Sequence, residues 1–176
     1  MDGIGRSTSP AAEAVSRDLR TDTSRFMRLR RRTTALSLLS TGALGLVEAY
    51  QAGLLRHLPE PPLAVFDADR VDASGEAYEL FKTPDAALGM VSFAVTAALA
   101  GMGGARRSDR RPWVPLALAA KVAADAAGSL LLTAEQVTKH RRLCSWCLLS
   151  AAASLATVPA AVPEAAAAWR SLRRRR

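Results

Sequence analysis

Long apolar segments alternate with short polar ones along this chain. Four segments, at residues 33–55, 86–105, 112–134 and 143–163, are rich in Leu, Ala and Val, and the second and fourth carry no charge. A soluble surface helix of that length would show a polar face, which these two segments lack. Crossing ~30 Å of hydrocarbon at ~1.5 Å per residue takes about 20 helical residues, so each segment is long enough to span a bilayer.

The predicted fold is therefore all-α, an integral membrane bundle of four helices. Backbone groups in lipid have no water to bond, so a single segment satisfies them only as a helix. The alternating pattern of a membrane β-barrel is absent from the sequence. A soluble, alanine-rich helical bundle is the alternative, because alanine is only weakly apolar and each segment taken alone is marginal.

Arginine clusters flank these segments on what we predict to be one side of the membrane. They comprise Arg25, Arg28, Arg30, Arg31 and Arg32; Arg106, Arg107, Arg110 and Arg111; and Arg170 with residues 173–176. By the positive-inside rule that side is the cytoplasm, so we expect a multi-pass protein of the cell membrane with both termini inside. Lys139, Arg141 and Arg142, in the short third loop, run against this pattern.

The overall charge also suits a different class of protein. The chain has 24 Lys and Arg against 16 Asp and Glu, a net charge of +8. A soluble basic helical protein that binds nucleic acid is therefore an alternative. Because the basic clusters stand beside the apolar segments, we instead predict contact with anionic membrane lipid and no nucleic-acid partner.

The ends of the chain are polar. Residues 1–24 lack the apolar core of a secretory signal. We expect a disordered basic cytoplasmic tail over 1–32, a membrane domain over 33–163 and a basic cytoplasmic tail over 164–176. That last tail is too short for a fused thioredoxin-like domain.

Both cysteines of the chain, Cys144 and Cys147, stand at the start of the fourth segment. At this spacing they share one helical face and can form a disulfide. A helix N-terminus and the neighbouring cations would stabilise a thiolate, the form that exchanges disulfides. Two small apolar core residues are the plainer interpretation. A zinc site would need His57 and His140 as further ligands, so we predict no metal and favour a redox pair.

The sequence around this pair resembles the vitamin K epoxide reductase family. The resemblance rests on Leu-Cys-Ser-Trp-Cys-Leu-Leu-Ser at 143–150, Asp-Arg-Val-Asp-Ala-Ser at 69–74, Thr83-Pro84 with Gly89, and Leu-Leu-Leu-Thr-Ala-Glu at 130–135. It implies a four-helix membrane bundle around a quinone near the outer surface. It also implies that Cys147 faces the quinone, that Cys144 exchanges with a thiol partner, and that Ser74 lies beside a quinone oxygen. Trp146 could stack on the quinone ring or anchor at the membrane interface.

Two departures from the family stand out. Members commonly carry two further cysteines in the first external loop, and here Ala68 stands where the second is expected. Some members have Tyr where this chain has Ala151. The internal electron relay is therefore missing.

The sequence thus predicts an enzyme, a membrane thiol–quinone oxidoreductase that passes electrons between its CxxC pair and a quinone of the menaquinone, ubiquinone or vitamin K type. Its partner would be a thioredoxin-like or other thiol protein on the outer side. The alternative is a non-catalytic membrane assembly or maturation protein that keeps the fold. Glu48, Ser74 and His140 are weak candidates for the proton donor, and Lys121 and Asp125 can pair on the third segment.

Overall fold

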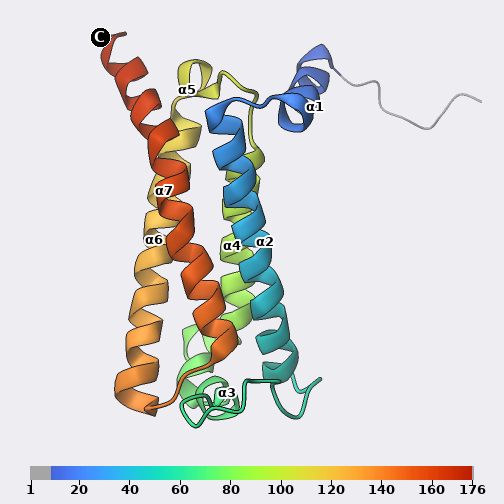
Figure 1. Cartoon of the computed structure of the whole chain (residues 1–176), viewed down its shortest axis with the longest axis vertical. Helices are drawn as coiled ribbons and strands as arrows, with labels where there is room; N and C mark the ends of the chain where they lie inside the picture. The colour runs from blue at the N-terminus through green and yellow to red at the C-terminus, as the bar shows by residue number, and fades with distance from the viewer. Residues whose placement is uncertain (1–8, 176) are drawn as a thin grey trace, which may run out of the picture.

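Residues 9–175 are described by the structure, a computed structural model, and their regular elements are all helical. Four long helices run side by side in alternating directions (Figure 1): α2 (Arg25–Gln51), α4 (Asp85–Gly101), α6 (Trp113–Glu135) and α7 (Ser145–Arg173). Helix α2 packs against α4 and α7, and α7 packs against α6. Between residues 9 and 175 there is no strand, only an isolated bridge between Phe66 and Leu143. The helical class is as the sequence predicts, and each of the four predicted segments overlaps one long helix.

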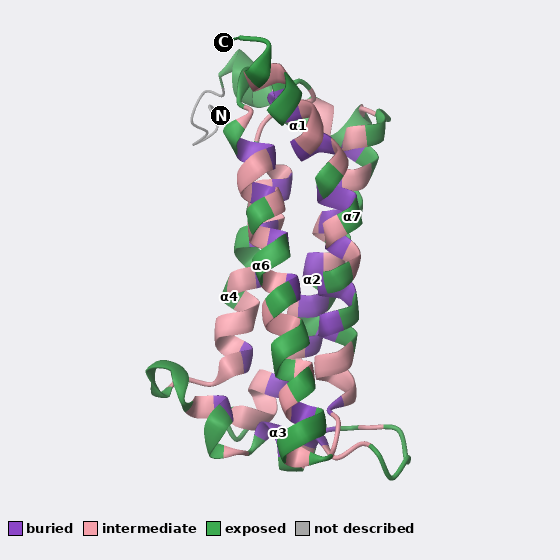
Figure 2. Cartoon of the chain, turned by 90° about the vertical axis from the view of Figure 1, so that its left-hand side faces the viewer, coloured by how far each residue is buried: buried purple, intermediate pink, exposed green. Residues whose placement is uncertain are grey.

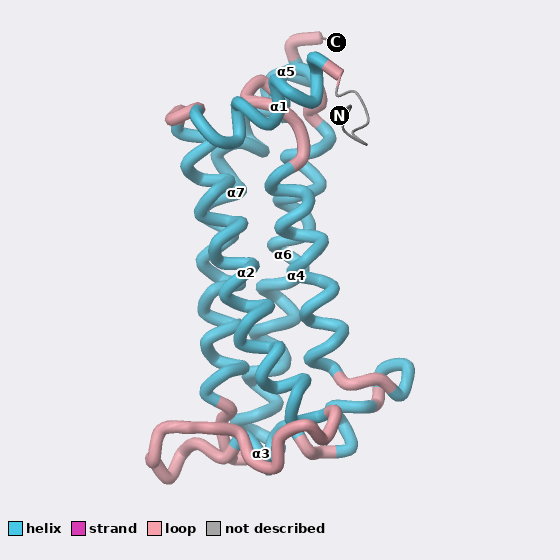
Figure 3. The backbone as a smooth tube through the Cα atoms, turned by 90° about the vertical axis from the view of Figure 1, so that its right-hand side faces the viewer, coloured by secondary structure: helices cyan, strands magenta, loops and turns pink. Residues whose placement is uncertain are grey.

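Short elements and loops gather at the two ends of the long helices (Figure 3). One end carries α1 (Pro10–Thr21), α5 (Arg107–Arg110) and the end of α7 (Figure 1). The other end carries α3 (Ala68–Asp72), the 3-10 turns η1 (Gly75–Tyr78) and η2 (Leu80–Lys82), and the π-helical turn η3 (Gln136–His140). The three arginine clusters lie at the first end and the cysteine pair at the second, which is the distribution that the predicted topology requires.

Two helices are long and apolar enough to cross a membrane. These are α6 together with η3, over Trp113–His140, and α7; α4 is apolar but has only 17 residues. Exposed residues run along the outer sides of the long helices (Figure 2). They include large apolar side chains such as Leu131, which is 69% exposed. Such a surface matches lipid better than water, so the helices support a membrane protein.

The interior between the long helices is built from small side chains. Buried alanines are joined by buried hydroxyl residues: Ser37, Ser40, Thr96, Ser154 and Thr157. Some of these hydroxyls bond within their own helix, as Ser37 Oγ does to Thr33 O at 2.9 Å, and Ser40 Oγ of α2 donates to Ser150 O of α7 at 3.4 Å. Small residues let helix backbones approach closely, which is how membrane helices associate without a hydrophobic driving force.

A buried ion cluster joins three helices at the α5 end. Glu164 of α7 accepts from Arg30 Nε of α2 at 3.0 Å and from Arg107 Nη2 of α5 at 2.7 Å. The three side chains are at most 3% exposed. Arg107 also donates to Leu99 O and Met102 O, at 2.6 and 2.8 Å.

This cluster corrects one boundary. The sequence predicts that a tail starts at 164, after Pro163, but α7 continues through Pro159 and Pro163 to Arg173. Proline costs a helical hydrogen bond, yet it is tolerated in apolar helices whose neighbours hold the flanking turns. The ion pairs of Glu164 fix the turn directly after Pro163.

The first 32 residues also differ from the predicted disordered tail. Residues 10–21 form α1, with Ser9 Oγ accepting from Ala12 N at 3.2 Å as its N-cap, and α2 begins at Arg25. Asp18 of α1 accepts from Ala105 N at 2.9 Å, so α1 is tied to the loop before α5. Capping and this tertiary contact order a polar helix that its composition alone would leave unfolded. Residues 1–8 of the predicted tail lie outside the described residues.

Candidate active site

The two cysteines open helix α7 as the sequence predicts. Cys144 is the N-cap residue, and its Sγ accepts from Cys147 N at 3.1 Å. Both cysteines are free; Cys144 is fully buried and Cys147 partly buried. The π-helical turn η3 contributes Gln136, whose Oε1 accepts from Cys144 N at 3.0 Å. The pair therefore sits on one helical turn with a fixed backbone.

Residues 59–67, here called the cover segment, contact the residues on both sides of Cys144. Glu60 Oε1 accepts from Ser145 N at 2.7 Å, and Pro59 O accepts from Trp146 Nε1 at 2.8 Å. At its other end the segment pairs with Leu143, whose N–H donates to Val65 O at 3.0 Å. Trp146 thus holds the cover segment, and the structure does not place it on the wall of the cavity described below.

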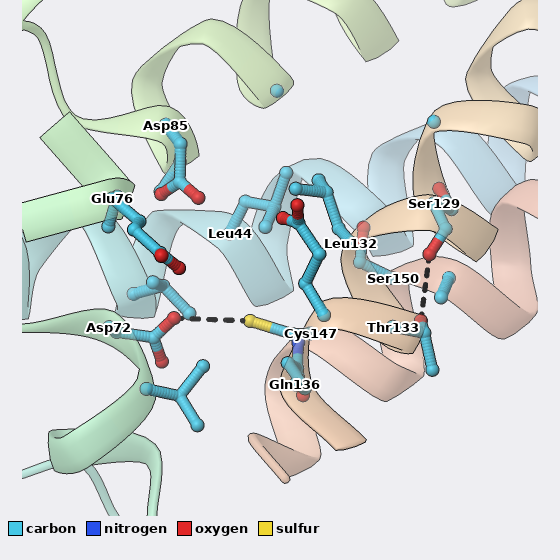
Figure 4. Close-up of a pocket in the computed structure, with 18 of the residues that line it drawn as sticks. Leu44, Asp72, Glu76, Asp85, Ser129, Leu132, Thr133, Gln136, Cys147 and Ser150 are labelled. Atoms are coloured by element: carbon cyan, nitrogen blue, oxygen red, sulfur yellow. Dashed lines mark hydrogen bonds between the residues drawn. The ribbon is translucent and has the colours of Figure 1, made fainter. Parts of the chain in front are cut away.

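An aspartate faces the second sulfur. Cys147 Sγ donates to Asp72 Oδ1 at 3.4 Å, and the two side chains point at each other (Figure 4). Asp72 ends helix α3 and is 3% exposed. Its Oδ2 has no hydrogen-bond partner within residues 9–175. Burial raises the pKa of Asp72 to about 6, although the hydrogen bonds from the thiols oppose the shift.

The cations expected beside the thiols are engaged elsewhere. Lys139 Nζ pairs with Glu135 at 2.9 Å and with Glu76 at 3.5 Å. Arg142 donates to Ala64 O in the cover segment at 2.9 Å. Acidic side chains of neighbouring segments compete for the basic loop, so the prediction that these cations stabilise a thiolate is wrong.

A cavity of about 270 Å³ lies beside Cys147, at the α3 end of the long helices. This size is near the lower end of small-ligand sites, ~300–1,000 Å³. Its polar lining includes Asp72, Ser74, Glu76, Asp85, Ser92, Asp125, His140, Cys147 and Ser150. The structure thus brings Ser74 and Cys147 to one cavity. Cys144 lies behind Cys147 and is not part of the lining.

The rest of the lining suits a flat apolar ring. Leu44, Val47, Phe93 and Leu132 form apolar walls, and Leu44 packs directly on Gly89. Ala151, the position at which the resemblance expects tyrosine in some members, contributes only a methyl group to the lining. A quinone carries only acceptor oxygens, which need donors. The hydroxyls of Ser74 and Ser150 and the protonated form of Asp72 are suitable donors, so the residues present fit a quinone.

A second polar group lies between α4 and α6. Lys121 Nζ contacts Asp125 Oδ1 at 2.5 Å and Ser92 Oγ at 2.7 Å, and Thr96 Oγ1 donates to Asp125 Oδ2 at 2.9 Å. Ser92 and Asp125 also line the cavity. The predicted Lys121–Asp125 pair is therefore confirmed, and it is hydrogen-bonded on both partners. Glu48, the acid of the first predicted span, does not line the cavity.

The sulfurs and Asp72 are also the residues that could hold a metal. The three ligand atoms of Asp72, Cys144 and Cys147 lie within 4.8 Å of one another. A structural zinc ion takes four ligands, so this group is one short. His57 and His140 do not complete it, because they pair with Asp69 at 2.6 Å and with Glu76 at 3.3 Å.

Comparison with known protein families gives one finding. The model of the vitamin K epoxide reductase family matches residues 32–162, most of the chain. The chain belongs to the vitamin K epoxide reductase family. The resemblance read from the sequence is thereby confirmed, and membership supports an oxidoreductase of the thiol–quinone type in general terms. Searches of curated proteins and of solved structures found no match to it.

Sequence reasoning missed Asp72. It lies within the 69–74 motif, but nothing in a linear sequence tells that its carboxylate meets a sulfur 75 positions later. The one available signal was an acidic residue two positions before Ser74, between Val71 and Ala73.

Proposed function

We propose that this protein is a membrane thiol–quinone oxidoreductase whose Cys144–Cys147 pair exchanges two electrons with a quinone in the cavity. The observation that carries the proposal is the position of Cys147. Its sulfur lines an apolar cavity that also contains Ser74, while Cys144 stands one helical turn away within disulfide reach. Cys147 is the quinone-facing thiol, and Ser74 donates a hydrogen bond to a quinone oxygen.

Electrons enter from a thiol partner through Cys144. A reduced thioredoxin-like or other thiol protein on the outer side attacks the Cys144–Cys147 disulfide at Cys144, and a second partner thiol resolves the mixed disulfide. Because Cys144 is fully buried and the cover segment is bonded to the residues beside it, this exchange requires residues 59–67 to move. Family members with loop cysteines carry their own relay; here the partner must reach the CxxC pair directly.

The proposed topology follows from the two ends of the molecule. Four spanning helices place the arginine-rich end in the cytoplasm, where it contacts anionic lipid headgroups, and the cysteine pair at the outer surface. Both termini then lie inside a multi-pass protein of the cell membrane. The quinone, of the menaquinone, ubiquinone or vitamin K type, enters the cavity from the lipid.

A second candidate function is a non-catalytic membrane assembly or maturation protein. The absent loop cysteines and the burial of Cys144 favour it, because both remove the usual route for electrons. In that case the cysteines are core residues and the cavity is a remnant of the family fold.

Turnover separates the two functions. Protein purified in detergent is given a small dithiol or a reduced thioredoxin, together with a water-soluble quinone, and hydroquinone formation is followed. We expect turnover that is lost in Cys147→Ser and Cys144→Ser and kept in Ser145→Ala, a neighbour whose backbone alone makes a contact. Cysteine-independent turnover would refute the mechanism. Folded protein without turnover for any donor would establish the non-catalytic function.

A further inference from the structure

We propose that Asp72 is the acid–base residue of the thiol–quinone step, accepting the proton of the Cys147 thiol and delivering it to a quinone oxygen. This inference rests on the proposed function and adds the proton path to it. Within residues 9–175, the earlier proton candidates Glu48, Ser74 and His140 make no hydrogen bond with either sulfur. Asp72 does, with Cys147 Sγ.

The two oxygens of Asp72 suit the two halves of this transfer. Oδ1 already accepts from Cys147 Sγ at 3.4 Å, which is within range of a hydrogen bond to sulfur. Oδ2 is buried and has no partner in the described part of the chain. A buried carboxylate oxygen without a partner costs free energy, and such a cost is retained where the group has another task. The same side chain lines the cavity, where Oδ2 can meet a quinone oxygen.

The chemistry requires a carrier of this kind. Each cycle breaks two S–H bonds and forms one S–S bond, which releases two electrons and two protons. The same two electrons and two protons convert a quinone into a hydroquinone. The Cys147 proton passes to Asp72 and then to one quinone oxygen. The Cys144 proton follows by the same carboxylate, whose ligand atom lies within 4.8 Å of that sulfur.

The charges around Asp72 keep its carboxyl easy to protonate. The titratable groups that face it are Cys144 and Cys147 of α7, Tyr50 of α2, Asp85 of α4, Tyr78 of η1 and Glu60 of the cover segment. All of them are acidic or phenolic. The basic side chains of η3, Lys139 and His140, are paired with Glu76. Together with burial, this raises the pKa of Asp72 to about 6, close to the value that suits a proton carrier near neutral pH.

The test compares Asp72→Asn with wild type in the quinone assay across pH. Asparagine keeps the shape but cannot accept a proton, so kcat should fall about 100-fold or more near neutral pH. Wild-type kcat should fall about tenfold per pH unit below about 6, where the carboxyl is protonated, and this acid limb should vanish in Asp72→Asn. Asp109→Asn is the matched control: it makes the same change at an exposed aspartate of α5, at the opposite end of the long helices.

Several outcomes would overturn the inference. If Asp72→Asn turns over as fast as wild type with an unchanged pH profile, Asp72 does not carry the proton. The proposed function still stands in that case, provided that turnover depends on the cysteines. Turnover that persists in Cys147→Ser overturns both. If Asp72→Asn does not fold, the pH profile of the wild type still tests the inference. A kcat that stays constant between about pH 5 and 7 would contradict a proton carrier that titrates near 6.

Discussion

Removal of the Glu164 carboxylate should strongly destabilise the α5 end of the protein. Glu164→Ala leaves the guanidinium groups of Arg30 and Arg107 in the interior, where each is at most 3% exposed. Breaking a buried pair from one side typically costs about 3–5 kcal/mol, because an uncompensated charge stays behind. Both arginines keep carbonyl partners, and Arg30 donates to Gly103 O and Gly104 O at 3.2 Å. We therefore expect the free energy of unfolding to fall by about 3 kcal/mol.

The assay is reversible unfolding in detergent micelles, followed by helical circular dichroism. Glu79→Ala serves as the control, because it also removes a glutamate from an ion pair, but Glu79 and Lys82 are about three-quarters exposed. Surface pairs contribute little, so this variant should behave like wild type. A triple replacement of Arg30, Arg107 and Glu164 by Met, Leu and Leu should recover most of the loss. Equal stability of Glu164→Ala and Glu79→Ala would refute the reasoning.

Three further predictions use the same preparations. Asp72→Asn should raise the unfolding midpoint at about pH 8 and leave it nearly unchanged at about pH 4. Burial raises the pKa of Asp72 in the folded state to about 6, from 3.8 in the unfolded chain. Between these two pH values the native state binds more protons than the unfolded state, so the free energy of unfolding of wild type falls by up to about 3 kcal/mol as pH rises through this range. A stability gain in Asp72→Asn seen only at pH 4 would contradict this. Lys121→Met should destabilise the protein more than Lys121→Met combined with Asp125→Leu, because the single change leaves a buried carboxylate unpaired; the reverse order would be contrary evidence. Ser74→Ala should raise KM for the quinone about fivefold, for one hydrogen bond of about 1 kcal/mol, with kcat unchanged; an unaltered KM would exclude that bond.

The helices could be predicted because their sequence signal is local. The charge-free segments at 86–105 and 143–163 correspond to α4 and to most of α7. The match is close because a long apolar run without a polar face can form few structures other than a helix. The ends were less predictable. Pro163 is an ordinary helix stop in sequence, yet α7 passes it because Glu164 meets arginines of two other helices.

The candidate site was predictable in part for the same reason. Cys144 and Cys147 could be predicted as a pair from their spacing at the start of one helix. Ser74 was predicted from the family resemblance of the 69–74 motif. The contact of Asp72 with Cys147 depends on the packing of α3 against the start of α7, which no short-range sequence pattern predicts. The predicted role of the basic loop was wrong because Lys139 pairs with Glu135, four residues before it, and with Glu76, which becomes a neighbour only in the folded chain.

The most direct test of the account is a single turnover without a reductant. Protein is reduced, freed of dithiol under anaerobic conditions and mixed with one equivalent of quinone, and both the thiols and the hydroquinone are counted. The account predicts that one hydroquinone appears for every two thiols lost, with a disulfide between Cys144 and Cys147 found by mass spectrometry of the peptide that contains both. Hydroquinone formed while both thiols stay reduced, or thiols that never react, would contradict it.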